Sequence, residues 1–202
     1  MNKVIGLTKV VILLLGLMSF QVSECEAQAN SEPNKISQAV GDAKMAIVNA
    51  RYDQAIDKLE QELATMPDDL EALTFLATAR AYKESDFLKA KQHFEDAINK
   101  GGGASFVVSH SHEISAMSVG DPNDYCRGWL HLRKGEARFV AHSDAHSVVI
   151  PFSDIVEFKQ NRMPKLFHIK FAKDKNYNFS PRSRDERESL LIIVMYQKLS
   201  RR

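Results

Sequence analysis

The chain has few residues that form disulfides or interrupt helices and strands: its 202 residues include two cysteines, six prolines and nine glycines. It also has a single tryptophan. The common catalytic motifs are also missing. The sequence has no Gly-x-Ser-x-Gly elbow, no His-Glu-x-x-His pair and no phosphate-binding glycine loop. We therefore predict a protein that is not an enzyme and that carries no cofactor and no catalytic residue.

The N-terminus has the three parts of a secretory signal peptide. Lys3 and Lys9 give a positive start, Val10–Phe20 is an apolar run of eleven residues, and Ala27-Gln28-Ala29 is a cleavage pattern. The run is shorter than the about 20 residues that a membrane-spanning helix needs. We predict a signal peptide over 1–29, cleavage after Ala29, and export to the periplasm or the medium. A retained anchor and a lipid anchor at Cys25 stay open as alternatives.

Cleavage there removes Cys25 and leaves Cys126 alone in the mature chain. A single cysteine cannot form an internal disulfide, so packing has to supply the stability. Cys126 lies in a strand-like apolar stretch, which indicates a small buried side chain rather than a nucleophile.

Neither half of the mature chain is strongly charged. Residues 30–100 hold 13 acidic and 9 basic residues, whereas residues 101–202 hold 11 acidic and 16 basic residues. The bases are spread rather than clustered, which argues against nucleic acid as a partner. The contrast favours attraction between the halves or contact of the second half with an anionic surface.

One pattern occurs twice, thirty-five residues apart. Tyr52-x-x-Ala55-x-x-x-Leu59 returns as Phe87-x-x-Ala90-x-x-x-Phe94. Apolar residues at steps of three and four predict short amphipathic helices across 30–100, which must bury their stripes against one another. A repeat of this length is typical of stacked helical hairpins that present a surface to a partner.

These residues resemble the tetratricopeptide repeat family over about 36–100. Ala55 and Ala90 match the small residue at the helix crossing, Leu59 and Phe94 match the bulky residue of the hairpin core, and Pro67 matches the terminal proline. The resemblance implies a protein-binding groove lined by first helices. Carried over to this chain, the groove positions are Glu71, Thr74, Thr78 and Tyr82. Use of these helices as a structural cap or a dimerisation element, in a homo-oligomer, is the alternative.

Gly101-Gly102-Gly103 ends the helical part and is predicted to form a hinge. Period-two alternation then predicts strands. They are Phe106–His112, Arg127–Arg133, Glu136–His142, Val148–Pro151, Asp154–Lys159, Phe167–Lys173 and Tyr177–Ser180. A helix with a capping box at Ser183-Arg184-Asp185-Glu186 and an apolar core at 190–196 follows.

Seven short strands and one capped apolar helix resemble a pleckstrin-homology-like barrel over 104–202. Gly128-Trp129-Leu130 and the corner at 149–155 are similar to its GRAM-type branch. Members of that superfamily that bind lipid gather bases near the first loop. The corresponding loop here, Ser118–Asp124, is acidic. A membrane surface is therefore an alternative partner and not the favoured one.

Six histidines fall in the second half, and His110 and His112 share one strand face. A zinc site needs three or four converging ligands, and the sequence does not specify strand neighbours. We predict no metal site. Convergence of His110 and His112 with His142 or His146 would indicate one, and in a cleft would favour an enzyme.

The sequence predicts an α+β protein with four parts: a signal peptide, 1–29; antiparallel helical hairpins, 30–100; a glycine hinge, 101–103; and a small antiparallel β-barrel with a C-terminal capping helix, 104–202. The expected function is that of an exported adaptor at the cell envelope that binds protein partners through Glu71, Thr74, Thr78 and Tyr82. The alternative is a membrane-surface or ligand-binding protein that acts through the β domain.

Overall fold

The computed structural model of the protein describes residues 37–111, 125–142, 147–161, 166–171, 175–183 and 185–201. Several predictions fall outside these residues. They are the signal peptide 1–29, the acidic loop 118–124, and the histidines His112 and His146.

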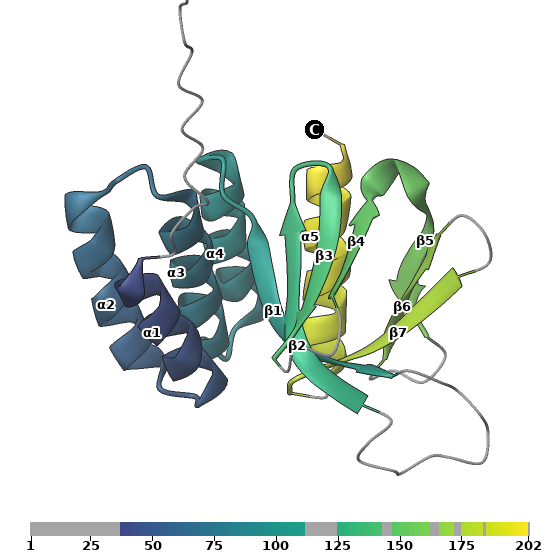
Figure 1. Ribbon diagram of the computed structural model, residues 1–202, viewed down its shortest axis with the longest axis horizontal. Coiled ribbons are helices and arrows are strands. Elements are labelled where there is room, and N and C mark those ends of the chain that lie inside the picture. Colours follow the sequence, from purple (N-terminus) through teal and green to yellow (C-terminus); the bar gives the residue numbers. More distant parts are fainter. Residues whose placement is uncertain are drawn as a thin grey trace, which may run out of the picture. The chain divides into compact units, whose positions relative to one another are not determined.

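Helices occupy the first part of the described chain, where the apolar stripes predict them. They are α1 (Gln38–Val48), α2 (Tyr52–Thr65), α3 (Leu70–Lys83) and α4 (Phe87–Asn99). Each packs on the next in chain order (Figure 1). Local chemistry sets their starts: Asp69 accepts hydrogen bonds from the first N–H groups of α3, and Asp86 does the same for α4.

Seven antiparallel strands follow. They are β1 (Ala104–Ser111), β2 (Tyr125–Arg133), β3 (Glu136–Ala141), β4 (Ser147–Pro151), β5 (Ile155–Gln160), β6 (Phe167–Phe171) and β7 (Lys175–Pro181). They form one open sheet in the order β4-β3-β2-β1-β7-β6-β5, with a 3₁₀ turn at Phe152–Asp154 between β4 and β5. Gly135 turns the β2–β3 hairpin with φ +85°, a conformation that suits glycine. The protein is therefore α+β, as the sequence predicts.

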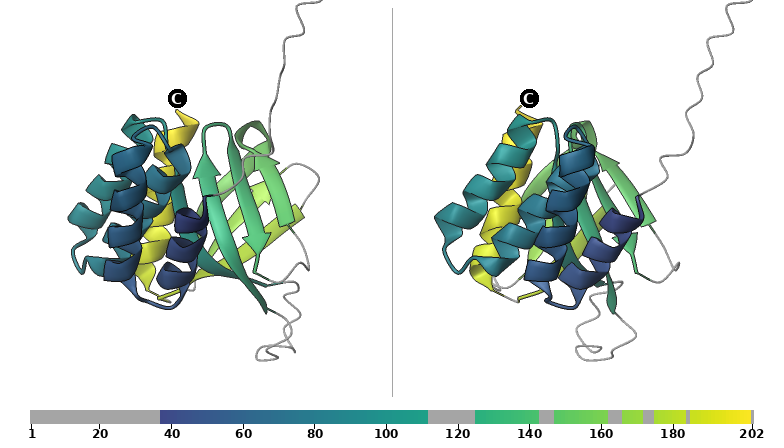
Figure 2. Two further views of the ribbon diagram at one scale, coloured as in Figure 1. Left: turned by 60° about the vertical axis from the view of Figure 1, so that its left-hand side comes forward. Right: turned by 90° about the vertical axis from the view of Figure 1, so that its left-hand side faces the viewer.

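The last helix, α5 (Glu186–Ser200), packs on the inner face of this sheet and also contacts α4 (Figure 2). Its apolar residues join a core that runs from α3 and α4 through the sheet. The buried aromatic residues of that core are Phe94, Phe106, Phe139, Phe158, Phe167 and Phe179. One hydrophobic core thus includes residues from both sides of the glycine segment.

The outer face of the sheet is half covered. A second core combines α1, α2 and α3 with Val107 of β1 and Trp129 of β2. The Trp129 ring meets Phe75 of α3 edge to face, with 5.1 Å between centroids. Gly101 takes φ +93° at the end of α4, and the next two glycines are buried where the chain passes from α4 into β1. Helices α1 and α3 therefore lie on β1 and β2, and β3 and β4 extend beyond them.

Candidate functional site

Three side chains of α3 hold the backbone of β1 and of Gly103, the residue just before it. Thr74 Oγ1 accepts a hydrogen bond from Gly103 N at 2.8 Å. Thr78 Oγ1 donates to Ser105 O at 3.0 Å. Further along, the Tyr82 hydroxyl accepts from Val107 N at 2.8 Å. The three contacts form a ladder between a helix and an extended strand.

The spacing of this ladder follows from the two backbone geometries. Four residues of helix rise about 6.0 Å, and two residues of strand rise about 6.6 Å. Side chains at every fourth helical position can therefore meet every second residue of a strand that lies alongside. Because β7 pairs with β1 only from Val108 to Ser111, the first half of β1 has no strand on that side. The α3 side chains satisfy groups that would otherwise form an exposed strand edge.

Two of the four predicted groove positions lie against the chain's own β1. Thr74 and Thr78 are buried beneath β1 and are not accessible to another protein in this structure. Glu71, the fourth predicted position, forms an ion pair with Lys44 of α1, and the Lys44 ammonium also lies over the Phe75 ring at 4.6 Å. The polar face of α3 that carries these predicted positions is therefore in contact with β1 in this structure.

Tyr82 connects this ladder to the last helix. Its hydroxyl donates to Glu188 Oε1 at 2.8 Å, and Glu188 Oε2 accepts from the backbone N–H and the hydroxyl of Ser183. Only 8 % of Glu188 is exposed. Burial, followed by the nearby Glu188 charge, raises the pKa of Tyr82, and burial raises the pKa of Glu188 despite its three donors.

Sequence reasoning missed this junction. The prediction placed the helix cap at Ser183, whereas Asp185 caps α5 by accepting from Arg187 N at 3.0 Å. Ser183 instead holds Glu188. The acidic residue three positions after Asp185 was a possible signal, because Asp followed by Glu at that spacing is itself a capping pattern.

The uncovered part of the outer face forms a second surface, which we call the bare face. It consists of outward-pointing residues on β2, β3 and β4, all of them exposed: Arg127, Arg133, Arg138, Val140, Ser147, Val149 and Pro151. Its one outward-pointing acidic residue among those described, Glu136, contacts Arg138 at 3.3 Å. The bare face therefore combines excess positive charge with exposed apolar side chains. The alternation of residues along each strand does not by itself reveal that these bases share one uncovered region.

Two of the described histidines, His131 and His142, share Trp129 as a neighbour, with 6.2 Å between ring centroids in each case. His110 is buried among Phe139, Tyr177 and Phe179. His131 shares a hydrogen bond with Ser105 at 2.8 Å. Burial and then the positive charges of Arg133, Lys44 and Arg138 lower the pKa of His131 to about 3.

His168 lies between Glu157, at 2.9 Å, and Asn161. Across the residues that the structure describes, no group of three or more His, Cys, Asp or Glu side chains is placed to hold a metal ion. Cys126 is 3.8 Å from His110 Nδ1, but burial raises the pKa of its thiol, so it is not an activated nucleophile. Within the described residues, no helix has both the length and the apolar character to cross a membrane.

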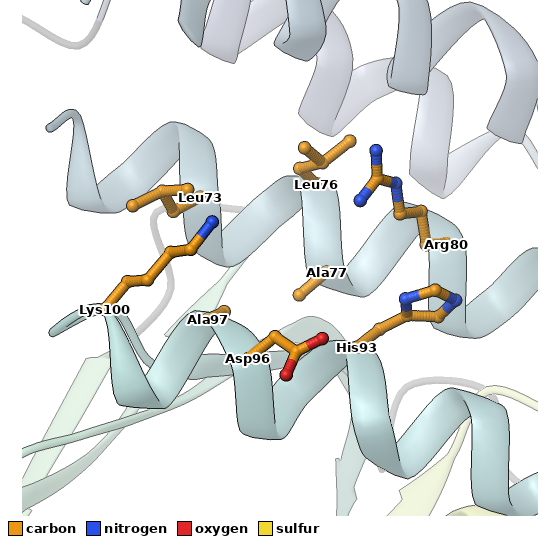
Figure 3. Close-up of a pocket in the computed structure, with 8 residues that line it drawn as sticks. All are labelled: Leu73, Leu76, Ala77, Arg80, His93, Asp96, Ala97 and Lys100. Atoms are coloured by element: carbon orange, nitrogen blue, oxygen red, sulfur yellow. The ribbon is translucent and has the colours of Figure 1, made fainter. Parts of the chain in front are cut away.

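A small groove lies between α3 and α4 (Figure 3). In that view Arg80 and His93 stand at one end, Lys100 and Leu73 stand at the other, and Ala77 lies between them. Its volume is about 60 Å³. Pockets for organic ligands usually measure about 300–1,000 Å³, so this groove is too small to be one.

Comparisons with known proteins leave the family open. No family model matches the chain, and no curated protein matches it. Among solved structures, the C-terminal domain of an unknown protein from Leishmania infantum is 12 % identical, with a TM-score of 0.34; the match covers 53 % of this chain and 94 % of that one. The Inner Membrane Complex (IMC) Sub-compartment Protein 3 (ISP3) from Toxoplasma gondii is 13 % identical, with a TM-score of 0.36, over 57 % of this chain and 82 % of that one. Both likenesses are too distant to indicate a function.

Proposed function

We propose that the protein is a non-catalytic adaptor, exported to the cell envelope, that binds an acidic protein partner through the bare face. The observation that carries this proposal is the exposure of three arginines together with Val140 and Val149 on a sheet region that no described helix covers. Arginine and apolar side chains side by side are typical of protein interfaces. The guanidinium fork suits carboxylates in particular.

The helical part has a different role in this proposal. Its tetratricopeptide-like hairpins hold β1 of a pleckstrin-homology-like barrel, so the two parts form one scaffold. Support comes from the ladder of Thr74, Thr78 and Tyr82, which uses the polar face that a groove would offer to a separate peptide. The partner surface is therefore the sheet and not the helices.

Site-specific photo-crosslinking in the producing cell tests the proposal. A photoreactive residue at Val149 is expected to form an adduct with a protein, and the double change Arg133→Glu with Arg138→Glu is expected to remove that adduct. Val156 on β5 is the matched control, because it is also an exposed valine on a strand. Adducts of equal yield at both positions, or adducts that survive the charge reversal, would contradict the bare face as the binding surface.

A membrane is the alternative anionic partner. Vesicles that contain about 30 % phosphatidylglycerol are expected to leave the purified protein in solution at about 0.15 M salt. Salt-sensitive co-flotation that the same two arginine changes abolish would favour the membrane-surface function instead.

A further inference from the structure

A cleft of about 350 Å³ opens where three helices meet, away from the bare face. It lies between the end of α3, the turn into α4 and the start of α5. The lining residues that matter for its chemistry are Tyr82, Glu84, Phe87, Arg187, Glu188 and Leu191. The volume falls within the range of about 300–1,000 Å³ that is usual for small-molecule pockets.

The walls of the cleft are of two kinds. Phe87 and Leu191 contribute apolar surface together with Ala81 and Ala90. The polar wall contains more carboxylates than cations. An apolar wall beside a charged one suits a ligand that has a hydrocarbon part and a charged end.

Two of these carboxylates already have a structural role. Asp86 accepts from Leu88 N at 2.7 Å and from Lys89 N at 3.0 Å, and these bonds lower its pKa. Asp185 caps α5 in the same way. The two helix N-termini balance the negative charge of Asp86 and Asp185, so these two carboxylates do not indicate a bound ligand.

Glu188 is different. It is 8 % exposed, and its three described hydrogen-bond donors, the Tyr82 hydroxyl and the two Ser183 groups, are neutral. Among the described residues, the positive charge that acts on Glu188 is that of Arg182, whose guanidinium donates to Ile47 O and does not line the cleft. A carboxylate removed from water is costly unless a positive charge compensates it. A cation in the cleft would supply that charge.

We propose that the cleft binds an organic cation, an ammonium or guanidinium group on an aliphatic stem, with Glu188 as its counter-charge. The stem lies along Phe87 and Leu191, and Glu84 adds negative charge at the rim. Arg187 faces the same cleft and favours a ligand that keeps its positive end close to Glu188. This site is independent of the proposed partner on the bare face.

Titration of the ¹⁵N-labelled protein with three probes tests the site: 1,5-diaminopentane, Nα-acetyl-lysine amide and Nα-acetyl-norleucine amide. The two amines are expected to shift the amide resonances of Glu84 and Leu191 with a Kd on the order of millimolar or tighter. The norleucine probe lacks the ammonium and is expected to cause no shift of these resonances. Binding of the diamine alone assigns a free amine, and binding of the lysine probe alone assigns a partner's side chain. No saturable shift with either amine would overturn the proposal.

Two variants separate ligand binding from a purely structural role of Glu188. Glu188→Gln is expected to weaken amine binding at least about tenfold. Glu186→Gln, an exposed neighbour on the same helical turn, is expected to leave it unchanged. If Glu188→Gln does not fold, Ser85→Arg decides the question, because it places a built-in cation at the cleft and is expected to block the amines. Unchanged affinity in a folded Glu188→Gln or in Ser85→Arg would contradict the proposal.

Discussion

Tyr82 and Glu188 are 106 residues apart in the chain, and their side chains are joined by a 2.8 Å hydrogen bond. The same hydroxyl accepts from Val107 N, so one oxygen atom connects α3, β1 and α5. Helix, strand and C-terminal helix are therefore expected to lose their structure together.

Tyr82→Phe tests this connection. The change leaves a buried backbone N–H without an acceptor and a buried carboxylate without one of its donors. We expect a loss of about 2–4 kcal/mol in the free energy of unfolding, since each unsatisfied buried group costs about 1–3 kcal/mol. Urea unfolding followed by circular dichroism measures the loss. Tyr125→Phe, at an exposed position, is the control and is expected to change stability by less than about 0.5 kcal/mol.

His131 makes stability depend on acid. Its pKa is lowered from 6.5 to about 3, so the folded state holds the ring neutral while the unfolded chain binds a proton below pH 6.5. Stability is therefore fully present above pH 6.5 and is lost as the pH falls from 6.5 towards 3, by a total on the order of 5 kcal/mol. Urea unfolding at steps between pH 7 and pH 4 measures the slope.

His131→Gln is expected to flatten that slope, because glutamine does not titrate, although the variant is less stable than the parent at pH 7. His93→Gln, at a partly exposed position on α4, is expected to keep the parent's slope. An unchanged slope in His131→Gln would assign the acid sensitivity to other groups.

Gly41 and Gly103 are expected to respond oppositely to alanine. A Cβ at Gly41, inside α1, meets no atom within 4 Å, and alanine is the better helix former. Gly41→Ala is therefore expected to stabilise the protein by about 0.5–1 kcal/mol. A Cβ at Gly103 would overlap the carbonyl oxygen of Leu132, so Gly103→Ala is expected to destabilise it by about 1–3 kcal/mol. Thermal unfolding of the two variants side by side checks the signs.

The start of α3 depends on Asp69 and not on its neighbour. Asp69 Oδ1 accepts from Glu71 N at 2.8 Å and from Ala72 N at 3.0 Å. We expect Asp69→Ala to cost about 0.5–2 kcal/mol, the usual range for loss of such a cap. Asp68→Ala removes the same charge one residue earlier, at an exposed position, and is expected to cost almost nothing. Equal losses in chemical denaturation would indicate a charge effect instead.

The sequence predicted the bounds of the strands well, but it did not predict which elements pack against one another. All seven strands lie within two residues of the predicted bounds at each end, because period-two alternation and the turn at Gly135 are local signals. Periodicity identifies which face of an element is buried, but not what covers it. The polar side chains of Thr74 and Thr78 therefore predicted a groove. No local signal in α3 predicted that β1 would lie against these two residues. Glu188 was missed for the same reason, since its partners lie far away in the chain.

The ladder between α3 and β1 also has a consequence for how such a chain can diverge over time. Every contact that α3 makes in it is to a backbone atom of the strand, and backbone atoms are common to all residue types except the missing N–H of proline. Mutations in β1 can therefore accumulate without disturbing the attachment, as long as they respect the sheet. The helix has no such freedom, because it must retain a hydroxyl at each of three positions four apart. Descendants of a common ancestor would be recognised by that hydroxyl spacing long after their strands had ceased to look alike.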